Sequence, residues 1–136
     1  MSKSSTAGAW FKKANQDLKV IKFLLDGADS DVLESCAFHC QQSIEKSIKG
    51  FLVHNLIRSK KIHDLRPLAE KAVSIDESLD FIILNKTLLD KITDFAVAYR
   101  YPDAVPELPP LTKSEVLDAR DLAQKCFNEL SKRCHE

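Results

Sequence analysis

Hydrophobic side chains recur at helical spacing near the start of the chain. Between Ala7 and Ala28 they step alternately by four and three positions, which places them on one face of a helix. Gly27 is expected to end this helix. Residues 1–7 are expected to form a flexible segment ahead of it.

The next helix is predicted from Asp31 to about Ile57, and its apolar positions fall on two sides. The main face runs from Leu33 to Phe51 at spacings of three and four. A second side carries Phe38, Leu52 and Leu56, roughly 100–140° away at about 100° per residue. Because a helix with two apolar sides lies in the middle of a bundle or faces a partner, we expect part of this second side to be exposed and to form a homodimer interface.

Three further helices are predicted in the second half of the chain. A short one follows Asp64, which can cap its first turn. An almost wholly apolar helix covers residues 79–99 and should be the most buried element. The prolines between Tyr101 and Pro110 indicate an extended crossing, and Thr112-x-x-Glu115 is a capping-box pattern that begins the last helix.

These elements predict an all-α fold. We expect an up-and-down bundle of four long helices plus one short helix, in a single domain over residues 1–136.

Composition narrows the possible functions. Lys+Arg and Asp+Glu both number 20, which excludes a bulk polycation that binds nucleic acid by charge alone. No apolar run approaches the roughly 18 residues of a membrane span, and the Ser-rich start lacks the apolar stretch of a signal peptide. We therefore expect a cytoplasmic protein that does not contact a membrane and whose four cysteines are thiols.

Metal and cofactor motifs are missing from the sequence. Cys36, His39 and Cys40 share part of a helical turn, but there is no CxxC pair and the cysteines occupy apolar positions. The chain also lacks a Gly-rich phosphate loop, GxSxG and HExxH. We expect neither a metal nor a cofactor.

A polar stripe follows the second predicted helix at spacings of three and four: His39, Gln42, Lys46 and Lys49. Lysines on one helical face can hold phosphate as point charges, and glutamine can hydrogen-bond a base or a ribose. The alternative is a solvated face on which Glu45 and Lys49 form an i,i+4 ion pair.

The connection over residues 58–66 is basic, with four Lys or Arg side chains against one Asp. Such a loop can contact phosphate or RNA. Alternatively, its cations complement the dipole at the end of the preceding helix.

A third group lies where the 79–99 helix gives way to the proline-rich segment, at Tyr99-Arg100-Tyr101-Pro102-Asp103. Arginine recognises phosphate and stacks on planar groups, and tyrosine offers a stacking face and a hydroxyl. An Arg100–Asp103 ion pair that holds the corner is the structural alternative, and both interpretations can be true.

Three stretches together resemble HEPN domains, the higher eukaryotes and prokaryotes nucleotide-binding family. They are Ala37–Lys49 (AFHCQQSIEKSIK), Ile62–Leu65 and Tyr99–Pro102, within a helical pattern opened by Trp10 and Asp17-Leu18. The resemblance covers about residues 8–132. It implies a helical bundle that pairs into homodimers and is often encoded beside a minimal nucleotidyltransferase, as toxin and antitoxin.

The residue groups and the resemblance together indicate a nucleotide- or RNA-binding protein that acts with a nucleotidyltransferase partner in a toxin–antitoxin-like system. The expected binding residues are Lys46, Lys49, His63, Tyr99, Arg100 and Tyr101.

Two other functions stay open. Some HEPN members are metal-independent ribonucleases with Arg-x4–6-His on a late helix; here no His follows Arg100 at that spacing, while Arg58-x4-His63 fits it within a connection. The tyrosine that nucleotidyltransferases modify in some toxins would follow that His by two, where this chain has Leu65. A ribonuclease toxin using Arg58 or Arg100 with His63 is therefore the first alternative, and a dimerisation adaptor without a ligand is the second.

Overall fold

A computed structural model describes residues 3–27, 30–103 and 108–134. Within them it contains no strand, so the predicted all-α fold is confirmed. The elements are α1 (Lys3–Gly27), α2 (Ser30–His54), α3 (Leu65–Ile75), a 3-10 helix η1 (Glu77–Asp80), α4 (Phe81–Leu84), α5 (Lys86–Arg100) and α6 (Lys113–Lys132).

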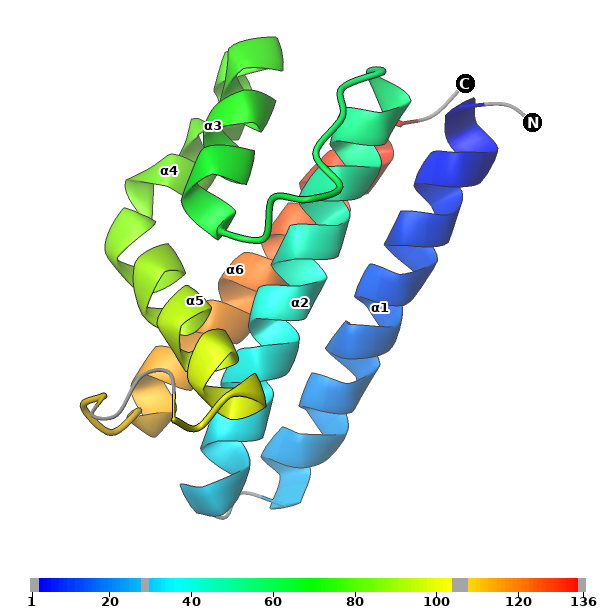
Figure 1. The fold of residues 1–136 in the computed structure, drawn as a ribbon. Helices are drawn as coiled ribbons and strands as arrows, with labels where there is room; N and C mark the ends of the chain where they lie inside the picture. Colours follow the sequence, from blue (N-terminus) through cyan, green and yellow to red (C-terminus); the bar gives the residue numbers. More distant parts are fainter. Residues whose placement is uncertain (1–2, 28–29, 104–107, 135–136) are drawn as a thin grey trace.

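Helix α2 is the middle of the bundle. It packs against α1, α3, α5 and α6, and α1 runs antiparallel beside it while α3, α4 and α5 lie on its other side (Figure 1). Its core positions include Ile44, Ile48 and Phe51. Gly50 lets α1 come close, because a Cβ atom there would lie 3.0 Å from a ring carbon of Phe11.

The second apolar side of α2 is less exposed than the sequence suggests. Leu52 is fully buried in the core, so the expectation that it lies on an exposed side is wrong. Leu52 belongs to the hydrophobic core of the single chain, in which α2 has helices packed on both sides. The helix ends at His54, and Leu56 follows with a left-handed backbone (φ 63°) and a side chain that is 75% exposed.

The predicted helix over residues 79–99 is broken at Asn85. Its side-chain Nδ2 donates to the Phe81 carbonyl at 2.8 Å, and its backbone N–H bonds back to Ile82, so α4 stops and α5 begins anew. This segment is also not the most buried element: Leu84 is exposed, whereas α2 is buried without interruption from Cys40 to Glu45. The expected set of four long helices and one short one is therefore replaced, in the described residues, by six α-helices of unequal length.

The start of α6 agrees with the sequence. Thr112 Oγ1 accepts the Glu115 N–H at 3.1 Å, and Glu115 Oε1 accepts the Thr112 N–H at 3.0 Å, which completes the capping box. Asp64 precedes α3 as expected, but its side chain makes no cap hydrogen bond. Residues 104–107 of the predicted extended crossing lie outside the described residues. At the N-terminus, residues 1–2 of the expected flexible segment also lie outside them, and α1 begins at Lys3.

Candidate functional site

The polar stripe of α2 faces α1. Asp17 on α1 is 6% exposed and accepts a hydrogen bond from Lys46 Nζ at 2.8 Å. A second hydrogen bond joins its other carboxylate oxygen to His39 Nδ1 at 2.9 Å. Because His39 and Lys46 are seven residues apart on α2, both lie on the same face two turns apart. One buried carboxylate thus ties two turns of α2 to α1.

A second group of polar side chains is centred on Glu45, which is buried, with Gln41 and Lys49 one helical turn before and after it. Glu45 Oε2 accepts from Lys49 Nζ at 3.0 Å and bonds to His63 Nδ1 at 3.2 Å. Its other oxygen accepts from Gln41 at 2.9 Å. Lys49 also donates to the Lys60 carbonyl at 3.2 Å, and Gln41 donates to the His63 carbonyl at 3.3 Å. These bonds fix the basic connection of residues 58–66 to α2.

The stripe is therefore neither a solvated face nor an open phosphate site. Lys49 is 2% exposed, and its ammonium also lies 5.7 Å from the centre of the Trp10 ring. Lys46 is 24% exposed and keeps some contact with solvent. Of the two lysines expected to bind phosphate, only Lys46 can reach a ligand without leaving its place.

The end of α5 packs on the start of α2 through aromatic rings. Tyr99 stacks on Phe38 with ring centres 4.6 Å apart and planes 19° from parallel. The Arg100 guanidinium carbon lies 5.2 Å from the centre of the same Phe38 ring. Tyr99 is 46% exposed, and Tyr101 is exposed beside it in the sequence. We call Phe38, Tyr99 and Arg100 the aromatic–arginine cluster.

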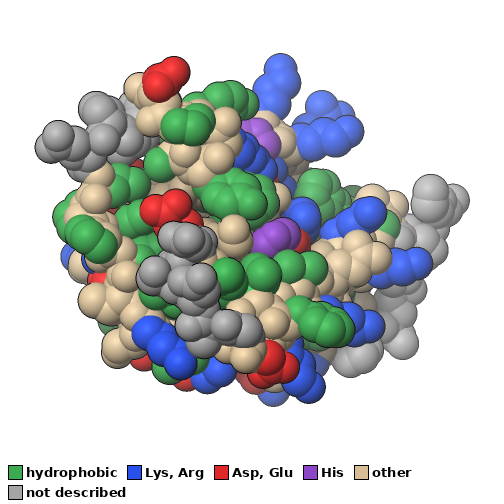
Figure 2. All heavy atoms as spheres, turned by 90° about the horizontal axis from the view of Figure 1, so that it is seen from below, with side chains coloured by type: hydrophobic (Ala, Val, Ile, Leu, Met, Phe, Trp, Pro, Cys, Tyr) green, Lys and Arg blue, Asp and Glu red, His purple; other side chains and the backbone are tan. Residues whose placement is uncertain are grey.

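This cluster is continuous with the network at Asp17. The Phe38 ring meets the His39 ring edge-on at 5.2 Å, and His39 is bonded to Asp17. Figure 2 shows this end of the molecule from below: hydrophobic and histidine side chains are exposed near its middle, with Lys and Arg side chains around them. Exposed aromatic faces beside cations can stack a base and hold a phosphate.

The Arg100–Asp103 ion pair considered from the sequence is not formed; both residues are described, and no bond between them is present. Arg100 instead lies on the Phe38 ring, where its guanidinium can stack as the sequence interpretation proposed.

His63 and Arg58, the other residues considered for ribonuclease chemistry, are both exposed. On α2, His63 contacts Glu45 and Arg100 contacts Phe38. Glu45 lies seven residues after Phe38. That separation is about 10 Å along α2. His63 and Arg100 are therefore held at different levels of the bundle within one chain.

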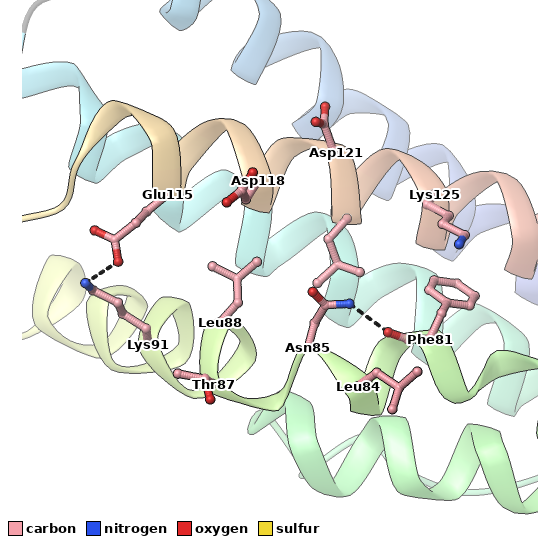
Figure 3. A pocket seen from close by; sticks show the side chains of 11 residues that line it. Phe81, Leu84, Asn85, Thr87, Leu88, Lys91, Glu115, Asp118, Asp121 and Lys125 are labelled. Atoms are coloured by element: carbon pink, nitrogen blue, oxygen red, sulfur yellow. Dashed lines mark hydrogen bonds and ion pairs between the residues drawn. The ribbon is translucent and has the colours of Figure 1, made fainter.

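A separate cleft of about 550 Å³ lies between α4–α5 and α6. Figure 3 shows the Lys91–Glu115 ion pair at one end and Phe81 with Lys125 at the other; the Lys125 ammonium lies 4.3 Å from the Phe81 ring centre. The residues that line this cleft include none of the six predicted to bind a nucleotide.

In the described residues, no group of three or more His, Cys, Asp or Glu side chains is placed to hold a metal ion. All four cysteines are free. Burial raises the pKa of the Cys134 thiol to about 11 and also raises the pKa values of Cys40 and Cys126. Among the described helices, none has the length and apolar character to span a membrane.

Two residues of the candidate site, Asp17 and Phe38, were not predicted from the sequence to have a functional role. Asp17 interrupts the apolar face of α1 at its edge, next to Leu18 and three residues after Ala14, and a charge in that position is a signal of a buried pair. Phe38 was assigned to an exposed hydrophobic side of α2, and only the fold shows that it supports Tyr99 and Arg100.

The chain is a small α-helical bundle with a buried polar network and an exposed aromatic–arginine cluster. This arrangement is suited to binding a ligand. The HEPN domain model matches residues 7–133, nearly the whole chain, and the chain belongs to the HEPN family. The resemblance seen in the sequence is thus confirmed. Neither the comparison with curated proteins nor the comparison with solved structures gives a match. Membership of this family supports a helical domain that binds nucleotides or RNA or acts like a ribonuclease.

Proposed function

We propose that this HEPN protein binds a nucleotide or single-stranded RNA at the aromatic–arginine cluster. One observation supports the proposal most: Tyr99 and Arg100 lie on the same Phe38 ring while Tyr99 stays 46% exposed. A base can stack on the aromatic side chain. The guanidinium next to it can donate two parallel hydrogen bonds to a phosphate.

The other predicted binding residues take different roles in this proposal. Tyr101 is exposed next to the cluster and offers a second ring. Lys46 lies on the part of α2 that faces α1, where it is paired with Asp17 and 24% exposed, and it supplies a cation to a longer ligand. His63 lies farther along α2, where a strand longer than one nucleotide could meet it. Lys49 acts indirectly, because it holds the connection that carries His63.

Arg100→Ala and Tyr99→Ala test this proposal. Each change is expected to weaken binding of a fluorescent single-stranded RNA 15-mer about tenfold, because a charged hydrogen bond or a base stack contributes about 1–3 kcal/mol and tenfold corresponds to about 1.4 kcal/mol. Fluorescence anisotropy measures the RNA affinity, calorimetry measures ATP binding, and a thermal melt measures the fold.

Lys132→Ala is the control, since Lys132 is an exposed cation near the end of α6 that pairs with Glu129 and belongs to none of the predicted binding groups. Its RNA and ATP affinities should equal those of the parent protein. If Arg100→Ala lowers the melting temperature and the parent protein binds neither ligand, Arg100 is a structural residue and the proposal is wrong.

We also propose that the protein pairs as a homodimer, as the HEPN resemblance implies. Of the three residues predicted on the second apolar side, Leu56, which follows the end of α2, is the exposed one. Leu56→Asn removes this apolar surface while suiting the left-handed backbone, because asparagine adopts that conformation more readily than leucine. We expect light scattering to report a dimer of the parent protein at tens of micromolar and a weaker dimer of the variant. A parent protein that is monomeric at that concentration contradicts the proposal.

The partner proposed for this dimer is a minimal nucleotidyltransferase in a toxin–antitoxin-like pair. The support comes from the family resemblance. A nucleotidyltransferase gene next to this one would strengthen the proposal, and an isolated gene would count against it.

A further inference from the structure

The outward face of α1 carries an excess of positive charge. Its exposed cations are Lys12, Lys13, Lys19 and Lys22. The exposed acidic residue on the same helix is Asp26, while Asp17 is turned toward α2 and paired there. Among the described residues, no ion pair involves any of these four lysines. No described acidic side chain therefore neutralises their charges by an ion pair.

Several of these side chains lie in one line. Lys12, Gln16, Lys19 and Phe23 step by four, three and four, which places them on a single outer edge of the helix. The line is about 16 Å long at 1.5 Å per residue. Lys22 lies beside it and, with Lys19, lines a groove of about 450 Å³ between α1 and α6. We call Lys12, Gln16, Lys19, Lys22 and Phe23 the α1 ridge.

Phe23 is the unexpected member of this ridge. Its side chain is 82% exposed although it is large and apolar. Helix α1 lies at the edge of the bundle in Figure 1, and Figure 2 shows Lys and Arg side chains gathered on that side with hydrophobic side chains exposed among them. Phe23 also takes no part in the hydrophobic core that the described residues form.

We propose that the α1 ridge binds the backbone of single-stranded RNA and that Phe23 stacks one of its bases. A row of cations that follows the backbone together with an aromatic platform is the combination used for single strands. This inference rests on the proposed RNA binding and extends it, because a mononucleotide bound at Arg100 cannot reach the opposite edge of α1.

The composition of the ridge favours RNA over a lipid surface. A helix that lies on a membrane needs a continuous apolar face. Here Phe23 is accompanied by Val20, which is about one-third exposed, while the rest of the line is Lys and Gln.

Charge reversal tests the ridge. Lys12→Glu combined with Lys19→Glu should weaken binding of fluorescein-labelled oligouridylate 15-mer at least tenfold near 100 mM salt. It should also flatten the slope of log K against log salt by about 1.4, since each lost phosphate contact contributes about 0.7 for a single strand. Phe23→Ala should weaken binding about tenfold and leave the slope unchanged, because stacking releases no counterion.

The matched control is Lys86→Glu combined with Lys113→Glu. It makes the same change in net charge at two exposed lysines, each the first residue of its helix, where a negative side chain interacts favourably with the helix dipole. Its RNA affinity should stay within twofold of the parent. Equal weakening by both double variants would mean that only bulk charge matters, and the ridge proposal would be wrong.

The outcomes separate the ridge from the aromatic–arginine cluster. Loss of oligouridylate binding in the Lys12/Lys19 variant with ATP binding intact supports the ridge. Loss in Arg100→Ala alone supports the cluster and overturns the ridge. A parent protein that binds vesicles of phosphatidylserine and phosphatidylcholine but not oligouridylate overturns the RNA assignment in favour of a membrane.

Discussion

Lys49→Ala is expected to destabilise the fold by about 3 kcal/mol, the low end of the cost of removing one partner from a buried ion pair. Lys49 is 2% exposed, and its ammonium is bonded to Glu45 and to the Lys60 carbonyl. In the variant, the buried Glu45 carboxylate loses its ammonium partner, and the Lys60 carbonyl loses the hydrogen bond that Lys49 donates. A thermal melt should show a loss of about 10 °C for a domain of this size.

This expectation reverses what the sequence suggests for the same variant. A lysine on a polar helical stripe should, when replaced, weaken ligand binding and leave the fold intact. The structure makes the stripe an internal surface, so Lys49→Ala acts first on stability. Any loss of RNA binding in this variant must be measured well below its melting temperature before it is assigned to a contact.

Two further variants separate the charge of Lys49 from its packing. Lys49→Met keeps the length of the side chain and removes the ammonium. Lys49→Met with Glu45→Gln removes both charges, and replacing a buried pair as a unit costs less than breaking it, so the double variant should recover more than half of the lost stability. Lys13→Ala, at an exposed lysine of α1, should change stability by no more than about 0.5 kcal/mol. If Lys49→Ala melts within 2 °C of the parent, the buried pair does not stabilise the fold.

The helices were predictable because their signals are local. The capping box at Thr112 and Glu115 depends on residues three apart, and the apolar spacing of α1 depends on neighbours in one helix. The helix break at Asn85 was not predicted because residues 79–99 are almost wholly apolar and have the pattern of one continuous helix. Its cause is a side chain that bonds to the backbone four residues earlier, and helical periodicity carries no trace of that competition.

The site could be predicted only in part for a related reason. Tyr99, Arg100 and Lys46 were expected in the proposed site from their chemistry and the family resemblance. Phe38 was not, because it contacts Tyr99 across 61 positions of sequence. Likewise, the burial of Lys49 depends on how α1 and the connection at Lys60 cover α2. Such contacts are set by packing between distant segments, and a single sequence does not reveal them.

Asp17→Ala is expected to destabilise the protein by about 3 kcal/mol and to disturb the aromatic–arginine cluster as well. The carboxylate is 6% exposed and bonds both Lys46 and His39, and its removal leaves a partly buried ammonium without a counter-charge. His39 then loses the bond that fixes its ring against Phe38. Chemical denaturation measures the stability, and the oligouridylate affinity of folded protein measures the effect on the cluster.

Asp17→Asn should cost less than Asp17→Ala, because the amide oxygen can still accept one hydrogen bond from Lys46. A double-mutant cycle of Asp17→Ala with Lys46→Met isolates the pair, and we expect a coupling free energy of about 1–2 kcal/mol because both groups share one contact. Additive losses in the cycle would show that Asp17 acts mainly through His39. If Asp17→Ala keeps the parent stability and the parent affinity, the network between α1 and α2 neither holds the helices together nor positions the cluster.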